Sequence, residues 1–240
     1  MTAPVDLLAI AAHRDDVELS CGGVLIKHAR KGQRIGIIDL TQGEMGSRGS
    51  AELRAEEAAR AAAVMGVAVR RNLELPDAAI ESTPDTRRRL AIMIRELRPR
   101  VVIAPALNGR HPDHRVGAQL IRDACFLAGL TKLDSRSAPH RPLKVIHAIA
   151  YREDNVKPTF VADISDEFET KLEAIRCYGS QFDGATQAGE VYPTGESLYD
   201  VVRVQSAHYG SLIRCRYGEP FHTTETMRAD DLLALEVSTF

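Results

Sequence analysis

The segment Leu7-Leu8-Ala9-Ile10-Ala11-Ala12-His13-Arg14-Asp15-Asp16-Val17-Glu18 decides the fold class of this chain. Its apolar first half predicts a buried parallel strand over residues 7–11, because a strand covered on both faces is apolar throughout. Ionisable side chains then gather at the carboxyl end of that strand, which is where open α/β sheets bind their ligands. A turn without a ligand would more often use Gly, Asn or Ser. We therefore predict that residues 13–18 supply half of a metal site.

The other half is predicted in His111-Pro112-Asp113-His114, which follows the apolar strand expected over residues 101–105. His13, Asp16 and His114 make a set of two imidazoles and one carboxylate with an open position. Such a set is typical of a catalytic zinc site rather than a structural one. The same set suits Fe²⁺, which the spacing does not exclude.

The remaining residues of the two clusters are candidates for catalysis. Asp15 need not bind the metal and is placed to act as general base on a water molecule. His111 is placed to protonate a leaving group or to stabilise an oxyanion, and Asp113 is a candidate for orienting the His111 ring.

Strands and helices are expected to alternate along the chain, which favours an α/β fold with a mostly parallel, twisted sheet and helices on both faces. No G-x-G-x-x-G, P-loop or G-x-S-x-G motif follows a strand, so dinucleotide, P-loop and α/β-hydrolase interpretations lose their main support. The further strands are expected at 34–40, 72–75, 145–151 and 159–164, and the helices at 24–31, 51–65, 84–98, 115–128, 167–178 and 198–217.

Bulk properties restrict the class of protein. The 240 residues carry a formal net charge of −2, which argues against nucleic acid or an anionic membrane as partner. No apolar stretch approaches the ~20 residues of a membrane span, and the N-terminus lacks the basic region of a signal peptide. The four cysteines are scattered and suit a reducing compartment. We expect a cytoplasmic protein with one domain over residues 1–240.

The two clusters resemble the motifs of the PIG-L/LmbE-like deacetylases, which carry A-H-[PA]-D-D after the first strand and H-P-D-H after a later one. Segments 39–49, 54–58, 72–73, 178–182 and 217–221 look like the bacillithiol-biosynthesis branch of that family. The resemblance thus runs over nearly the whole chain. Arg14 departs from it, because Pro or Ala is usual there; this cation either lowers the pKa of the neighbouring carboxylates or points to solvent.

The resemblance implies a Rossmann-like fold and a zinc-dependent N-deacetylase, with His13, Asp16 and His114 as zinc ligands, Asp15 as general base and His111, oriented by Asp113, as oxyanion or acid partner. It implies N-acetylglucosaminyl-malate as substrate, glucosaminyl-malate and acetate as products, and a homo-oligomer, commonly a hexamer. Another acetamido sugar stays open as substrate: a mycothiol precursor, a chito-oligomer or an antibiotic intermediate. A non-catalytic, sugar-binding relic of the fold is the alternative from another class.

Candidate substrate contacts are mostly arginines, because a guanidinium fork suits a dicarboxylate such as malate. They are Glu44, Arg48, Arg54, Arg110 and Arg141. Other polar residues are expected to be structural: the histidines at 28, 147, 208 and 222, and Cys21 as a buried thiol. The basic runs 70–71 and 87–89 are expected on solvated faces or subunit contacts.

Overall fold

The computed structural model describes residues 3–133, 136–150, 156–183, 197–234 and 236–237. Its strands are β1 (Leu7–Ala11), β2 (Ile35–Thr41), β3 (Val69–Leu75), β4 (Val101–Pro105), β5 (Lys144–Ala148), β6 (Phe160–Asp163) and β7 (Gly218–His222). Its helices are α1 (Asp16–Arg30), α2 (Ala51–Val64), α3 (Pro84–Leu97), α4 (Pro112–Ala128), α5 (Phe168–Arg176), α6 (Gly179–Phe182) and α8 (Leu198–Leu212), with a short 3₁₀ turn η1 at Leu232–Ala234.

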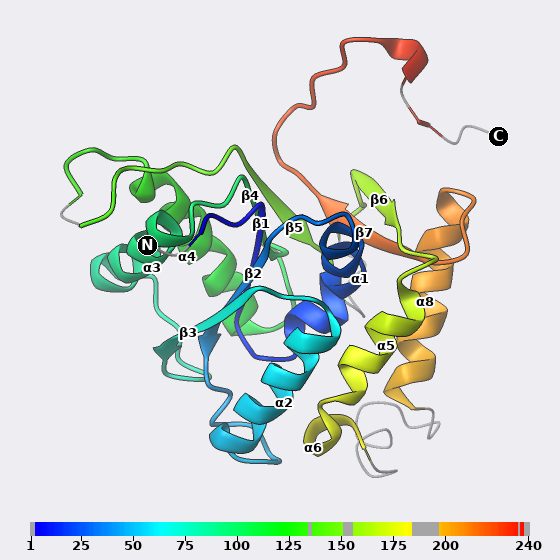
Figure 1. Cartoon of the computed structure of the whole chain (residues 1–240), viewed down its shortest axis with the longest axis horizontal. Helices are drawn as coiled ribbons and strands as arrows, with labels where there is room; N and C mark the ends of the chain where they lie inside the picture. Colours follow the sequence, from blue (N-terminus) through cyan, green and yellow to red (C-terminus); the bar gives the residue numbers. More distant parts are fainter. Residues whose placement is uncertain (1–2, 134–135, 151–155, 184–196, 235, 238–240) are drawn as a thin grey trace.

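All seven strands lie in one sheet with the order β3-β2-β1-β4-β5-β7-β6 (Figure 1). The pairs among β3, β2, β1, β4 and β5 are parallel, whereas β7 is antiparallel to both of its neighbours. This confirms the predicted α/β fold with a mostly parallel sheet. One domain over residues 1–240 stays a prediction.

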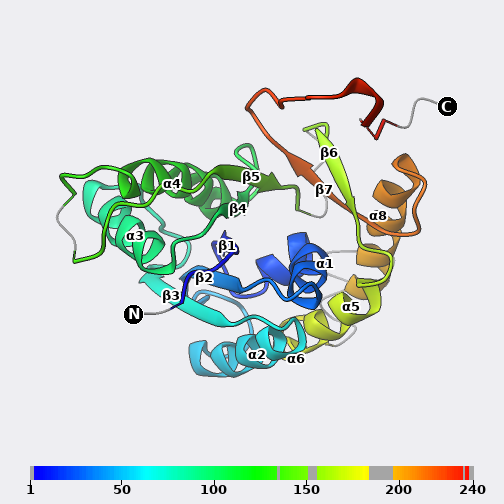
Figure 2. The same cartoon turned by 45° about the horizontal axis from the view of Figure 1, so that its top comes forward.

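Helices cover both faces of the sheet because successive side chains of a strand point to opposite sides. On β1, Leu7, Ala9 and Ala11 pack in one apolar cluster with α1, α2 and α5. Leu8 and Ile10 pack in a second cluster with α3 and α4. Figure 2 shows the two helical layers on either side of the strands.

The strands β1 and β4 are neighbours in the sheet, paired in parallel from Leu7 with Val101 onward. The helix that follows β1 packs on one face and the helix that follows β4 packs on the other. The chain connections therefore diverge at this pair of strands, which opens a crevice at their carboxyl ends. Both predicted half-sites follow these two strands.

The C-terminal part of the sheet differs from the prediction. The last helix, expected over 198–217, ends at Leu212, and the chain then forms β7 between β5 and β6. The sequence of β7, Gly-Glu-Pro-Phe-His, has no alternating apolar pattern, and proline normally argues against a central strand. The strand β7 forms because β5 on one side and β6 on the other pair with its backbone.

Three elements begin earlier than expected. The first helix starts at Asp16 instead of residue 24, and its backbone is non-helical at Cys21, where φ is −144°. The helix α4 starts at Pro112 instead of residue 115, and β3 starts at Val69 instead of residue 72. The end of the strand expected over 145–151 and most of the loop expected over 179–197 lie outside the described residues. Among the residues that are described, no helix is both long and apolar enough to cross a membrane.

Candidate metal and catalytic site

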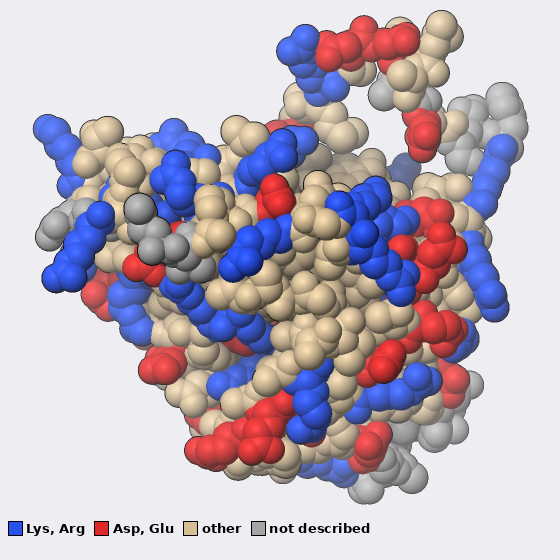
Figure 3. All heavy atoms as spheres, in the orientation of Figure 1, with Lys and Arg blue, Asp and Glu red and all other residues tan. Residues whose placement is uncertain are grey.

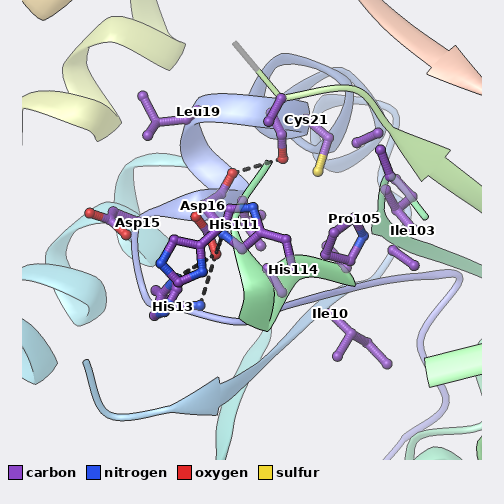
Figure 4. Close-up of a pocket in the computed structure, with 18 of the residues that line it drawn as sticks. Ile10, His13, Asp15, Asp16, Leu19, Cys21, Ile103, Pro105, His111 and His114 are labelled. Carbon is purple, nitrogen blue, oxygen red and sulfur yellow. Dashed lines mark hydrogen bonds and ion pairs between the residues drawn. The ribbon is translucent and has the colours of Figure 1, made fainter. Parts of the chain in front are cut away.

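Three side chains from the two strand ends meet at one carboxylate oxygen. Oδ2 of Asp16 lies 3.2 Å from Nδ1 of His13 and 3.1 Å from Nε2 of His114, and it accepts the backbone N–H of His13 at 2.8 Å. One ligand atom from each of the three residues lies within 4.8 Å of the others, a spacing that can hold a metal ion. Figure 4 shows these residues converging, with Asp15 beside them rather than among them.

The second ring nitrogen of His13 has a partner that the sequence reasoning did not single out. Nε2 of His13 lies 3.1 Å from Oδ1 of Asp77, which follows β3 at the same edge of the sheet. A histidine that binds a metal usually donates its other N–H to a carboxylate, which fixes the ring and raises its basicity. The sequence signal was available, because Asp77 stands just past the carboxyl end of a strand.

The charged groups around His13 shift one another's pKa values. Burial would lower the pKa of the His13 imidazole, but the carboxylates of Asp16, Asp77 and Asp15 outweigh it and raise that pKa to about 11. Burial would raise the pKa of Asp16, yet His114 and His13 hold it well below its usual range. The bond to His13 lowers the pKa of Asp77 to about 2. A metal ion that binds here has to displace protons from the imidazoles.

Asp15 is held by a buried arginine. Its Oδ1 accepts a bond from Nη2 of Arg54 at 3.2 Å, and Nη1 of Arg54 donates to the carbonyl of Gly43 at 3.0 Å. Gly43 has φ +73°, and a Cβ there would meet the Arg54 guanidinium at 2.2 Å, so only glycine fits. Burial raises the pKa of the Asp15 carboxyl, and Arg54 opposes that shift. A carboxylate with a raised pKa is suited to accept a proton.

His111 is the N-cap residue of α4, and its Nδ1 accepts the backbone N–H of Asp113 at 3.2 Å. Burial lowers the pKa of His111, and the neighbouring imidazoles of His114 and His13 lower it further. The ring is therefore neutral with its proton on Nε2, because an Nδ1–H would face another donor. A neutral ring can donate a hydrogen bond to an oxyanion through Nε2–H, which is one of the two roles predicted for His111.

Asp113 orients His111 through its main chain rather than through its carboxylate. The carboxylate accepts the N–H groups of Ala78 at 2.8 Å and Ile80 at 3.4 Å, and it lies 3.6 Å from Nε2 of His13. Asp113 therefore ties the loop after β3 to the start of α4. One ligand atom from each of His13, His111 and Asp113 also lies within 4.8 Å of the others.

These groups open into a cavity of about 340 Å³ at the carboxyl ends of β1, β4 and β5. Loop residues such as Met45, Gly46 and Arg110 line it, together with Phe182 of α6. Its remaining wall is mostly apolar and small, from Ala9, Ala11, Leu19, Cys21, Ile103 and Ala148. The cavity therefore combines polar groups that can carry out proton transfer with an apolar wall beside them.

The five expected substrate contacts are distributed unevenly. Arg54 and Arg110 line the cavity. Arg48 instead donates to the carbonyl of Asp183, and Glu44 accepts the N–H of Asp77, so both hold loops together. Arg141 stacks over Phe126 near the last turn of α4, whereas His111 stands at the first turn. The structure thus places Arg141 away from the site, contrary to the prediction.

Two arginines near the site have structural partners. Arg14 is buried and donates to the carbonyl of Ala51 at the start of α2, so it neither faces solvent nor lines the cavity. Arg70, expected on a solvated face, is half-buried, and it binds Asp39 at 2.8 Å through two nitrogens and Glu18 at 2.7 Å. The sequence pattern of β3 did not reveal this pairing, because both carboxylates come from other elements.

Cys21 lines the cavity, and burial raises the pKa of its thiol, as expected of a structural cysteine. The four cysteines are all free. None of the four histidines expected to be structural is among the described residues that line the cavity. Nδ1 of His147 donates to the carbonyl of Pro105 at 2.7 Å and supports the end of β4.

Comparisons with known proteins show what the chain is similar to. Residues 8–125 match the family model PIG-L, described as GlcNAc-PI de-N-acetylase. Diacetylchitobiose deacetylase of Thermococcus kodakarensis is 30% identical over 230 residues, which cover 89% of this chain and 80% of that protein. 1D-myo-inositol 2-acetamido-2-deoxy-alpha-D-glucopyranoside deacetylase 1 of Saccharopolyspora erythraea is 26% identical over 240 residues, with 75% and 79% covered. The crystal structure of the conserved protein TT1542 from Thermus thermophilus superposes with a TM-score of 0.84 at 35% identity, covering 94% of this chain and 98% of that one.

Proposed function

The chain belongs to the PIG-L/LmbE-like deacetylase family, and from this premise we propose that it hydrolyses the N-acetyl group of an N-acetylglucosamine conjugate. The observation that carries the proposal is the convergence of His13, Asp16 and His114 beside Asp15 in one cavity. A sugar-binding relic of the fold would have no need to keep a buried carboxylate with a raised pKa next to a complete ligand set.

His13, Asp16 and His114 would hold the metal, and the donor set fits one. Each can offer a ligand atom to a common point, and His13 has the carboxylate of Asp77 on its other nitrogen. The set suits Zn²⁺, and Fe²⁺ has the same preference. When bound, such an ion supplies Lewis acidity, which polarises an amide carbonyl and lowers the pKa of water.

The chain's own residues account for the proton transfers. Asp15, held in place by Arg54, takes a proton from the water that attacks the acetamide carbon. Nε2–H of His111 donates to the oxygen that becomes negative, while Asp113 N–H keeps the ring in that tautomer. Asp15 then gives this proton to the departing amine as the C–N bond breaks. The products are acetate and the free amino sugar.

Within this class, the specific substrate we propose is N-acetylglucosaminyl-malate of bacillithiol biosynthesis, on the resemblance of segments 39–49 and 178–182. Arg110 at the cavity is a candidate to contact the malate carboxylates. The alternatives are a chito-oligomer or a mycothiol precursor, since relatives named for deacetylation of both kinds of sugar match the chain. Arg54 does not discriminate between them, because its guanidinium binds Asp15 and Gly43.

We further propose, from the resemblance, a cytoplasmic homo-oligomer such as a hexamer. Neither the location nor the oligomeric state affects the chemistry that we propose for the site.

The test is an acetate-release assay with metal analysis. Protein loaded with Zn²⁺ or Fe²⁺ is offered N-acetylglucosaminyl-malate, diacetylchitobiose, the inositol-linked acetamido sugar and free N-acetylglucosamine. We expect the highest kcat/KM for the malate conjugate and one metal ion per chain. Acetate release that favours diacetylchitobiose would overturn the malate assignment alone. No acetate from any acetamido sugar would overturn the deacetylase proposal.

A further inference from the structure

The chain leaves the body of the protein after β7 and runs outward (Figures 1 and 2). Every described residue from Thr224 to Val237 is exposed. Arg122 of α4 holds the start of this segment through Thr224 Oγ1 at 3.0 Å and Glu225 Oε1 at 3.3 Å. We call residues 224–234, 236 and 237 the C-terminal arm.

The arm carries apolar side chains that nothing in its own chain covers, as far as the structure describes it. Leu233 is 96% exposed and Leu232 78%, and Met227 and Val237 are also largely exposed. Covering apolar side chains that are exposed to water stabilises a contact, so clustered exposed leucines mark an interaction site. The arm is also acidic, with four carboxylates (Glu225, Asp230, Asp231, Glu236) against the single guanidinium of Arg228.

A surface of matching character lies where α4 ends. We call it the α4-end patch, and it consists of Phe126, Leu130, Leu143, Arg100 and Arg141. Phe126 is 57% exposed and Leu143 74%. The Arg141 guanidinium stacks 4.5 Å from the Phe126 ring, and the N–H of Leu143 donates to the carbonyl of Arg100. Figure 3 shows Lys and Arg side chains gathered on this side of the molecule, over α3 and α4. The patch is apolar and basic where the arm is apolar and acidic.

The positions of the two features allow a symmetrical exchange. Arg122, which holds the start of the arm, and Phe126 of the patch are one helical turn apart on the same face of α4. Two copies that face each other across a twofold axis near α4 would each direct an arm toward the other's patch. Residues 226–237 can extend about 40 Å, at ~3.3 Å per residue, which exceeds the ~18 Å radius of gyration of a 240-residue domain.

We propose that the C-terminal arm binds the α4-end patch of a second copy of this chain. Leu232 and Leu233 pack on Phe126 and Leu143 of that copy, and the neighbouring aspartates lie beside Arg100 and Arg141. The contact is separate from the metal site and does not depend on which reaction the site performs.

The first test is the mass of the full chain in solution by light scattering. The wild-type protein is expected as a multiple of its 26.3 kDa chain mass at micromolar concentration. The double variant Leu232→Asp/Leu233→Asp and the single variant Phe126→Asp are each expected to raise the dissociation constant at least 10²-fold and to have a lower mass than the wild type at that concentration. The matched control Val204→Asp, an exposed valine on α8 away from arm and patch, is expected to keep the wild-type mass. Circular dichroism checks that all variants are folded.

A second test identifies which copy receives the arm. Chains with Leu233→Cys and differently sized chains with Phe126→Cys, both with Cys177→Ser and Cys215→Ser, are mixed and oxidised. We expect a disulfide between chains of different size. The proposal is overturned if the wild-type protein has the mass of one chain, or if Leu232→Asp/Leu233→Asp keeps the wild-type mass. It is also overturned if a chain carrying both cysteines cross-links only within itself.

Discussion

Two groups of charged side chains lie along α1, and their partners are arranged differently. At the start of the helix, Asp16 Oδ2 takes contacts from His13 and His114 at once, and all three face the cavity. At the break near Cys21, Glu219 of β7 accepts the N–H groups of Gly23 and Val24 at 2.8 Å and the Lys171 ammonium at 2.6 Å. Lys171 also donates to the carbonyl of Leu19 at 2.9 Å.

In the second group, Lys171 and Glu219 find their partners within the chain itself. The break at Cys21 leaves N–H and C=O groups of the helix without helical partners, and the Lys171–Glu219 pair satisfies them on both sides. In the first group, two imidazoles compete for one carboxylate oxygen, which is an arrangement that a cation completes. Carboxylates paired with basic side chains thus hold a helix together in one place and form a candidate ligand site in the other. The difference is whether the chain itself supplies every partner.

The largest expected effect separates the two groups by activity. His114→Ala should lose the metal and at least about 10³-fold of kcat/KM, because one of three ligands is gone. The metal-free variant should unfold within about 1.5 kcal/mol of the metal-free wild type, since Asp16 keeps the backbone N–H and the ring of His13. Metal analysis, acetate release and urea unfolding measure these quantities. A stability loss above about 3 kcal/mol would mean that the first group is structural as well.

The complementary variant is Lys171→Met, which should lower the free energy of unfolding by about 3–5 kcal/mol, because Glu219 is left buried without its cation. Metal content per folded chain should stay unchanged. The double variant Lys171→Met/Glu219→Gln should recover part of the loss, which a double-mutant cycle measures. Equal losses in the single and double variants would show that the pair is not coupled.

Asp15→Asn tests the carboxylate beside the first group. Turnover should fall at least 10²-fold while the metal is retained, because an amide cannot accept the proton from water. The control is Glu57→Gln, which changes a buried carboxylate that binds Ser180 outside the cavity. Full activity of Asp15→Asn in the acetate-release assay would remove Asp15 from the mechanism.

The smallest expected effect concerns Asp77. Asp77→Asn should weaken metal binding about 10-fold, because the His13 ring loses a charged partner and with it some basicity. Competition with a chelator gives the affinity. Glu44→Gln is a matched control in the loop that binds Asp77, and it touches no imidazole in the described structure. An equal loss in both variants would assign the effect to the loop instead of to the charge.

The sequence predicted the parts of this protein that are local. The two half-sites are His13-Arg14-Asp15-Asp16 and His111-Pro112-Asp113-His114, and each follows an apolar run. These runs were enough to place both half-sites at strand ends. Parallel pairing of β1 with β4 then brings the half-sites together. The family resemblance rests on the same residues, and the family comparisons agree with it.

Only the tertiary structure decided which charged residues are partners. Contacts between distant segments place Asp77 against His13, Arg54 against Asp15, and Arg70 between Asp39 and Glu18. They also place Arg141 at the far end of α4. The same holds for β7, whose Glu219 completes the break in α1 from 195 positions away. The physical reason is that hydrophobic periodicity records which side of an element faces the core. The partner of a charged side chain is set by which elements the fold brings within a few ångströms.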